Sequence, residues 1–226
     1  MRIKSTFFVS LWLLAVGAHA ADPAPRISIN ALLADTQQRA EAADTLAMVW
    51  WIPEDFWRAS INKGDPATAA QAEAVAEVFR PYVVVLALDG VMGALGGVTY
   101  KSEPEIRAGL KLIDSAGTRY SPLDAAAVSE DVKSFMSYMQ PMSARILGQL
   151  GDNMHFFYFP STDKDGRLIA DPHFDGVFTV AWLGREFRYR LPLASLVPPR
   201  VCPVDNEQLN GTWKYCPWHG AKLLER

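Results

Sequence analysis

The hydrophobic positions along the chain follow two different periods, and each period predicts a different kind of element. Short apolar or alternating runs predict strands at 45–52, 82–88, 106–113, 154–160, 177–182 and 186–191. Apolar residues spaced three or four apart predict helices at 29–43, 67–79 and 130–150, and a further helix starting at Pro53. Because strands and helices are interspersed and hairpin-length turns join the late strands, we expect an α+β fold with a mainly antiparallel sheet and packed helices.

Proline and glycine mark the breaks in this pattern. Pro141 lies inside the predicted helix 130–150 and should kink or divide it, because proline cannot donate the helical hydrogen bond. Gly90–Gly97 contains four glycines and predicts a loop, but the spacing matches no phosphate-binding or dinucleotide motif. Pro198-Pro199 predicts a hinge that leads out of the core.

The first 20 residues have the layout of a cleavable signal peptide. Arg2 and Lys4 precede an apolar run from Phe7 to Gly17, and Ala18-His19-Ala20 ends it with small residues. The run has about 11 residues, whereas a membrane-spanning helix needs roughly 20. We therefore expect a signal peptide at 1–20, a core domain at 21–199 and a tail at 200–226. The mature protein would be periplasmic or secreted, with no membrane span after cleavage.

The charged residues of the chain limit the classes of partner that it can bind. The whole chain has 22 Lys+Arg against 25 Asp+Glu, and no cluster of basic residues stands out. Nucleic-acid binding needs grouped Lys and Arg, so we expect no nucleic-acid partner. Half of the residues are hydrophobic and seven are Trp, which is enough for a sizeable buried core.

The tail repeats one short pattern. Cys202-Pro-Val-Asp205 is followed by Leu209, and Cys216-Pro-Trp-His219 is followed by Leu223, with equal offsets in both copies. Asp and His, three residues after each Cys, are both potential metal ligands. The chain has only two Cys, so the repeat offers a mixed ligand set of Cys202, Asp205, Cys216 and His219.

This pattern resembles the zinc ribbon, in which two Cys-Pro-x-Cys-Gly-x-x-Leu knuckles bind one tetrahedral zinc ion. The resemblance covers residues 202–223 and implies that Cys202 and Cys216 are first ligands of the two knuckles. Asp205 and His219 stand where the family has its second cysteines. Export into an oxidising compartment favours the other outcome, a Cys202–Cys216 disulfide with no cofactor, and we prefer it to zinc at this stage.

A second group of polar residues suggests enzyme chemistry. Asp171, His173 and Asp175 alternate, so an extended chain would present all three on one face, and His155 could join them. The alternative is a polar loop between two strands, which we favour. Asp163-Lys-Asp165-Gly166 partly matches a calcium loop but lacks its first Asp and last Glu, so we predict a turn.

No catalytic motif is complete in this chain. We therefore expect a non-enzymatic binding or envelope-accessory protein whose partner is an envelope protein or a small ligand. The alternatives are a metal-dependent hydrolase built on Asp171, His173 and Asp175, and a protein that binds zinc through its tail.

Overall fold

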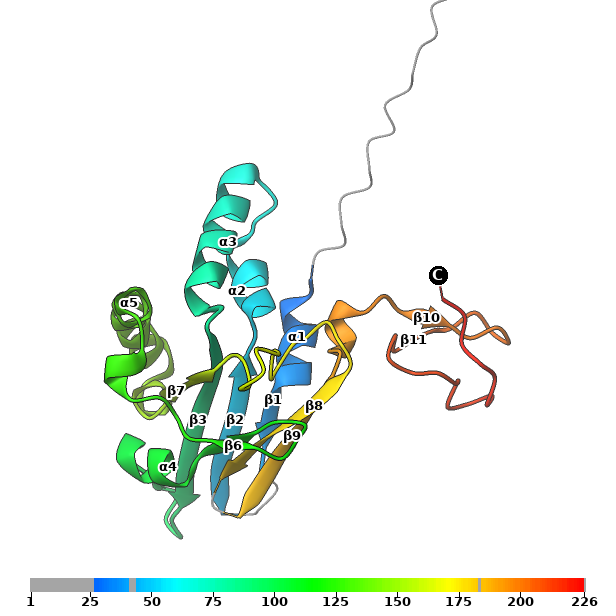
Figure 1. Ribbon diagram of the computed structural model, residues 1–226. Coiled ribbons are helices and arrows are strands. Elements are labelled where there is room, and N and C mark those ends of the chain that lie inside the picture. Colours follow the sequence, from blue (N-terminus) through cyan, green and yellow to red (C-terminus); the bar gives the residue numbers. More distant parts are fainter. Residues whose placement is uncertain (1–26, 41–43, 183, 226) are drawn as a thin grey trace, which may run out of the picture.

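The computed structural model describes residues 27–40, 44–182 and 184–225 (Figure 1). The predicted signal peptide at 1–20 and the last residues of the predicted helix 29–43 lie outside the described residues. Helices and antiparallel strands are interspersed along the chain, which confirms the α+β prediction. The domain boundaries stay predictions.

The first sheet is built around two long central strands. It contains β1 (Gln37–Arg39), β2 (Thr45–Ile52), β3 (Tyr82–Met92) and β4 (Val98–Tyr100) in that order, and β7 (His155–Pro160) also pairs with β3. All of these pairings are antiparallel. Apolar residues line both faces of β2 and β3, so both faces of this sheet must be covered.

The second sheet covers one of those faces. Its order is β6 (Arg119–Tyr120), β5 (Lys111–Ile113), β8 (Gly176–Trp182) and β9 (Arg185–Leu191), again antiparallel. Odd-numbered residues of β2 and β3, including Trp51 and Val85, pack against Phe178 and Tyr189 of this sheet. The alternation of strand side chains therefore places Trp51 between the two sheets.

Three of the helices cover the opposite face of the first sheet, whereas Leu32 of the first helix and Ile106 of the fourth pack into the core between the sheets. The helices of the described residues are α1 (Ile29–Thr36), α2 (Glu54–Ile61), α3 (Pro66–Phe79), α4 (Glu103–Gly109), α5 (Glu130–Leu147) and α6 (Gln149–Asp152), with 3₁₀ turns at Ala125–Ala127 and Ala194–Leu196. Even-numbered strand residues such as Val84 and Leu86 pack against Trp57, Phe79 and Val132 of three helices. The result is a layer of helices, a central sheet and an outer sheet (Figure 1).

Two sequence predictions were wrong in detail. The predicted helix 29–43 ends at Thr36, because the next three residues pair with β2 as strand β1. The predicted strand 106–113 is a strand only from Lys111, and α4 precedes it. Ile106 and Leu110 alternate with polar residues but are also four apart, and both are fully buried. A capping box at Ser102 and Glu105 decides the choice in favour of the helix.

The other predicted breaks agree with the structure only in part. Pro141 lies within α5 without dividing it, and the predicted helix 130–150 is instead interrupted at Gly148, after which α6 begins. The glycine segment forms a turn, although β3 extends into it as far as Met92. Gly90 has no room for a side chain there, since a Cβ would lie 2.6 Å from Cγ1 of Val98. No helix of the described residues is long and apolar enough to cross a membrane.

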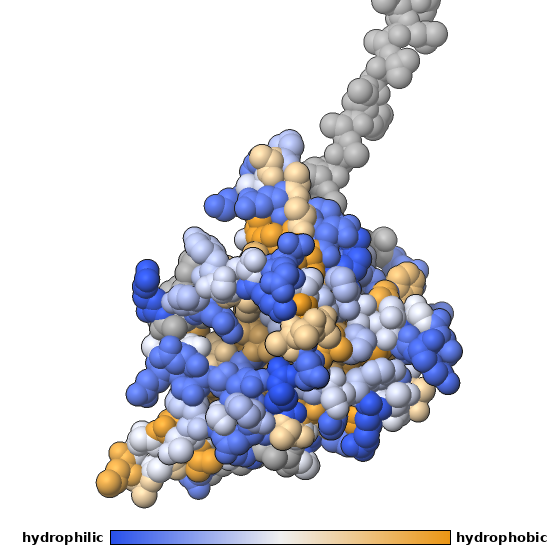
Figure 2. All heavy atoms as spheres, turned by 60° about the vertical axis from the view of Figure 1, so that its left-hand side comes forward, coloured by the Kyte–Doolittle hydropathy of each residue, from blue (hydrophilic) through white to orange (hydrophobic). Residues whose placement is uncertain are grey.

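The face of the molecule in Figure 2 is mostly hydrophilic. Figure 2 shows one face on which apolar residues form separate patches between polar side chains. Scattered apolar residues of this kind are ordinary on protein surfaces and indicate no partner by themselves.

The C-terminal segment meets the core through a close backbone contact at Gly211. A Cβ on Gly211 would lie 2.1 Å from the carbonyl oxygen of Pro198, so Gly211→Ala must displace one of the two segments. We expect a loss of about 1–3 kcal/mol of stability, as for other overpacked sites. Thermal unfolding would measure it, with Gly97→Ala as the control because nothing lies within 4 Å of its Cβ position. Equal unfolding temperatures for the two variants would contradict the contact.

Candidate metal centre

The two copies of the tail repeat form two equivalent turns. The N–H of Asn206 donates to the carbonyl of Cys202, and the N–H of Gly220 donates to the carbonyl of Cys216, both at 2.9 Å. Asn206 and Gly220 have φ of 63° and 64°, the left-handed conformation that Gly and Asn tolerate best. The sequence repeat is therefore also a structural repeat, with one Cys at the start of each turn.

Short strands join these turns. β10 (Arg200–Val201) pairs antiparallel with β11 (Gln208–Leu209), and Val201 also pairs with Leu224 near the end of the chain. The segment between the turns is held within the tail, where the Arg200 side chain donates to the carbonyl of Trp213 at 2.9 Å. This arrangement brings the start of the second turn against the first.

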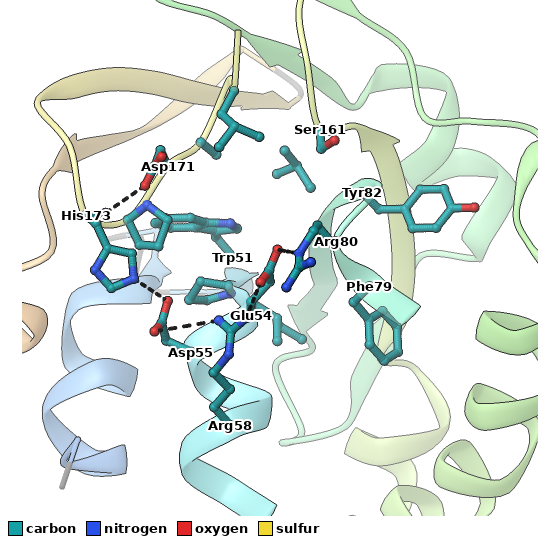
Figure 3. A pocket seen from close by; sticks show the side chains of 16 residues that line it. Trp51, Glu54, Asp55, Arg58, Phe79, Arg80, Tyr82, Ser161, Asp171 and His173 are labelled. Carbon is teal, nitrogen blue, oxygen red and sulfur yellow. Dashed lines mark hydrogen bonds and ion pairs between the residues drawn. The ribbon is translucent and has the colours of Figure 1, made fainter. Parts of the chain in front are cut away.

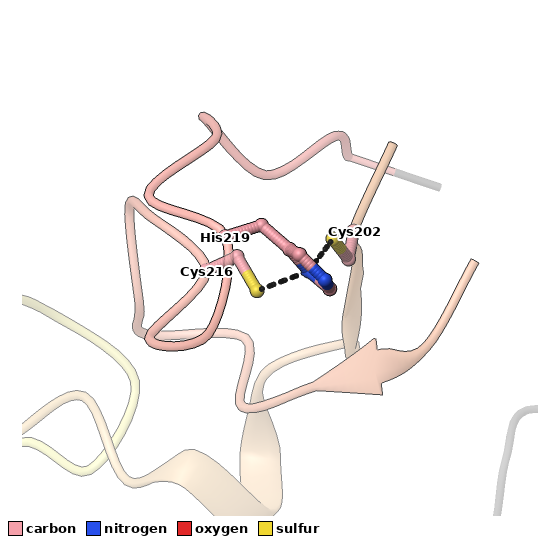
Figure 4. A group of neighbouring side chains, drawn as sticks. All are labelled: Cys202, Cys216 and His219. Atoms are coloured by element: carbon pink, nitrogen blue, oxygen red, sulfur yellow. Dashed lines mark hydrogen bonds between the residues drawn. The ribbon is translucent and has the colours of Figure 1, made fainter. Parts of the chain in front are cut away.

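The two cysteines and His219 point at one another (Figure 4). Nδ1 of His219 lies 3.4 Å from Sγ of Cys202 and 3.5 Å from Sγ of Cys216. The two cysteines approach to 3.6 Å, and all three ligand atoms lie within 4.8 Å of one another. Among the described residues this is the one group of three or more His, Cys, Asp or Glu residues close enough to hold a metal ion.

These separations are close to the edges of a tetrahedron around zinc. With zinc bonds of about 2.3 Å to sulfur and about 2.0–2.1 Å to nitrogen, a tetrahedron has edges of about 3.8 Å between sulfurs and about 3.6 Å between sulfur and nitrogen. The two sulfur–nitrogen distances and the cysteine separation each fall within a few tenths of an ångström of these values. The cluster is thus the right size for a four-coordinate ion.

Asp205 lies beside the cluster without completing it. Its Oδ2 is 3.7 Å from Nδ1 of His219, but it does not join the group of mutually close ligand atoms. The N–H of Glu207 and the side chain of Cys202 lower the pKa of Asp205, so the group is an available carboxylate at neutral pH. Asp205 occupies in the first turn the place that His219 has in the second.

The surroundings favour a thiolate at Cys216. Both cysteines are buried, whereas the His219 side chain is about a third exposed. Burial raises the pKa of Cys216, but the N–H groups of His219 and Trp218 outweigh it with help from the Cys202 and His219 side chains, and the net pKa is lowered. Burial raises the pKa of its partner Cys202. A buried pair with one favoured thiolate is suited to a cation.

The segment has almost no hydrophobic core of its own. Its buried cluster consists of Cys202, Leu209, Cys216 and Leu223. Folded units below roughly 40 residues usually need a disulfide, a metal or a partner to hold them. Both cysteines are free in this structure, so the disulfide expected from the sequence is not formed here and stays a prediction.

The second predicted group does not converge on a metal-ligand set. Asp171 and His173 line one cavity, and the N–H of His173 donates to Oδ1 of Asp171 at 3.0 Å. Asp175 does not line that cavity, and His155 lies on β7 beside a different one. Burial lowers the pKa of His155, as expected for a half-buried strand histidine. The geometry gives the hydrolase alternative no ligand set.

Sequence reasoning missed the actual partner of His173. Its Nε2 lies 3.1 Å from Oδ2 of Asp55, a buried carboxylate in the first turn of α2 (Figure 3). The two residues are 118 positions apart, and no local pattern links them.

Asp163 and Gly166 form the predicted turn, in which Oδ1 of Asp163 accepts from the N–H of Asp165 and of Arg167.

Comparisons with protein-family models, with curated proteins and with solved structures return no match to this chain.

Proposed function

We propose that the C-terminal segment binds one zinc ion through Cys202, Cys216 and His219, and that this ion holds the segment folded. The observation that carries the proposal is the size of the cluster, whose three ligand atoms are spaced as a tetrahedral zinc site requires. The resemblance of the repeat to zinc-ribbon knuckles supports it independently.

The ligand types select zinc among common ions. Two thiolates and one imidazole are ligands that zinc prefers, whereas calcium and magnesium require oxygen atoms. Asp205 would supply the fourth ligand after a small rotation of its side chain, because its Oδ2 is already 3.7 Å from His219. A closed set of four protein ligands is typical of structural zinc rather than catalytic zinc.

A disulfide between the same cysteines is the competing proposal. The expected export to an oxidising compartment favours it, and the cysteines are already only 3.6 Å apart. The orientation of His219 favours zinc, because a disulfide gives its Nδ1 no reason to lie equally close to both sulfurs. The two outcomes are chemically exclusive at any one time and can be separated by experiment.

The deciding experiment uses the full mature chain, purified without chelators and in parallel with and without a thiol reductant. Elemental analysis should give one zinc per chain in the reduced sample. Replacement by cobalt(II) should give the intense visible absorption of a tetrahedral site together with thiolate-to-cobalt charge transfer. An intact mass lower by two hydrogens, with no bound zinc in either sample, would establish the disulfide instead.

The individual ligand residues should contribute unequally to zinc affinity. His219→Ala removes the atom that lies between both sulfurs, and we expect zinc affinity to fall by about 100-fold or more, beyond the 10- to 100-fold that residues merely supporting a ligand provide. Asp205→Ala should cost less, since water can take the fourth position. Competition with a coloured zinc chelator would measure both, and an unchanged affinity in His219→Ala would exclude the proposed ligand set.

Zinc affinity should fall as the pH is lowered. Zinc binds thiolates and neutral imidazole, so protons compete with the ion at Cys202, Cys216 and His219.

For the whole chain, we propose an exported binding protein without catalytic activity. Sequencing the N-terminus of the protein recovered from the cell envelope or medium would test export, with processing expected after Ala20.

A further inference from the structure

A second site is formed by a cavity between α2 and the loop that precedes β8 (Figure 3). Its volume is about 360 Å³, within the range of small-molecule pockets. Apolar side chains including Trp51, Ala170 and Pro172 line it together with six Asp, Glu, Arg and His side chains. The six are Glu54, Asp55, Arg58, Arg80, Asp171 and His173.

The two arginines of this cavity are already neutralised. Arg58 pairs with Glu54 at 2.7 Å and with Glu73 at 2.8 Å. Arg80 pairs with Glu54 at 3.4 Å and with Glu73 at 3.1 Å, and it also contacts Glu77. Because three glutamates surround two guanidinium groups, little positive charge remains to attract an anion.

The aspartates retain acceptor capacity. Asp55 is 4% exposed, and among the described residues its one side-chain hydrogen bond joins Oδ2 to His173. The guanidinium of Arg58 lies 4.0 Å from Asp55, which is beyond hydrogen-bond distance. Asp171 uses Oδ1 to accept from the backbone of His173, and Oδ2 has no partner among the described residues. No oxygen of Asp55 or Asp171 is among the fully buried unpaired side-chain atoms of the described residues, so a donor in the cavity can reach both carboxylates.

Together these charges make the cavity acidic. The cavity lining carries the carboxylates of Glu54, Asp55 and Asp171 against the guanidinium groups of Arg58 and Arg80, an excess of one negative charge. Glu73 and Glu77 lie outside the lining and pair with the two arginines from there. The low dielectric of a partly enclosed cavity strengthens the attraction of such a set for a cation. Among the described residues, no group of mutually close metal ligands includes Asp55, and apolar side chains form much of the lining, which suits a cation carried on an apolar body.

From this geometry we propose that the cavity binds a small organic cation, an ammonium or amidinium group carried on an apolar body. The cationic group donates to Asp55 and Asp171, and the apolar part packs against Trp51 and Pro172. Leu168, which is 56% exposed, forms part of the rim over the bound molecule. This proposal is independent of zinc in the tail, because no described residue after His173 lines the cavity.

Isothermal titration of the full chain with matched probes tests this assignment. Phenethylamine and benzamidine carry the cation, 2-phenylethanol is the neutral analogue and 3-phenylpropionate is the anionic one. Saturable binding is expected for the two cations, at least tenfold tighter than for the alcohol, with the carboxylate weakest. Equal binding of the alcohol or tighter binding of the carboxylate would overturn the proposal, and so would no binding by any probe.

Variants locate the site. Asp55→Asn should weaken cation binding about tenfold or more, since it removes a charged acceptor and keeps the shape. Asp175→Asn is the matched control, because it lies two residues from His173 but outside the cavity and should leave binding unchanged. If Asp55→Asn does not fold, Leu168→Arg places a competing cation at the exposed rim and should also weaken binding. Cation binding unaffected by Leu168→Arg, or lost in Asp175→Asn, would place the ligand elsewhere.

Discussion

Replacing Cys216 by Ser is expected to abolish stoichiometric zinc binding and to unfold the C-terminal segment while the core stays folded. The four-residue buried cluster of this segment includes both cysteines, so loss of the ion removes its cross-link and part of its core together. Hydrogen exchange should show residues 200–225 losing protection. The strands β2 and β3, which are buried between the helices and the second sheet, should keep theirs.

The same experiment separates the two cross-links. Cys216→Ser also removes a disulfide, so the wild-type chain is compared untreated, with a zinc chelator alone and with reductant alone. Zinc as the cross-link predicts that chelator alone exposes the segment, whereas a disulfide predicts that reductant alone does so. Full protection of 200–225 in Cys216→Ser would mean that neither cross-link is needed.

Replacing Trp51 by Ala should lower the free energy of unfolding by about 3–5 kcal/mol, the usual cost of truncating a buried aromatic residue. Trp51 is 2% exposed and meets Phe178 and Tyr189 edge-to-face, with ring centroids 4.9 and 5.7 Å away. It packs between the two sheets and also lines the cavity beside α2, so its removal leaves a void at the interface of the sheets. Denaturant unfolding followed by circular dichroism would measure the loss.

Trp218→Ala is the matched control for this change. Its side chain is 73% exposed, and substitutions at such positions usually change stability by less than about 0.5 kcal/mol. A similar loss of stability in the two variants would contradict the placement of Trp51 between the sheets.

The local pattern of apolar and polar residues was sufficient to predict most of the helices and strands. The apolar runs of β2 and β3 and the alternation of β9 are direct signals of burial on two faces or on one face. The wrong predictions occurred where the same apolar residues fit both the two-residue period of a strand and the 3.6-residue period of a helix. Ile106 and Leu110 fit both a strand and a helix, and capping at Ser102, which hydropathy alone does not register, decided between them.

The metal cluster and the cavity differ in how much the sequence could reveal. Cys202, Cys216 and His219 belong to a short repeat whose turns are fixed by local backbone bonds, so their convergence could be anticipated. The pairing of Asp55 with His173 depends on how α2 packs against a distant loop, and no spacing encodes it. The sequence did single out His173, but it grouped His173 with Asp171 and Asp175 and did not indicate Asp55, because alternation along the chain was the only available guide.

X-ray absorption at the zinc edge of the full, reduced chain is the most direct test of the zinc assignment. The cluster predicts one zinc per chain with two sulfur neighbours at about 2.3 Å and two nitrogen or oxygen neighbours at about 2.0–2.2 Å. His219→Ala should remove the imidazole scattering and leave both sulfurs. A chain that takes up no zinc under reducing conditions, or a zinc ion without sulfur neighbours, would contradict the assignment.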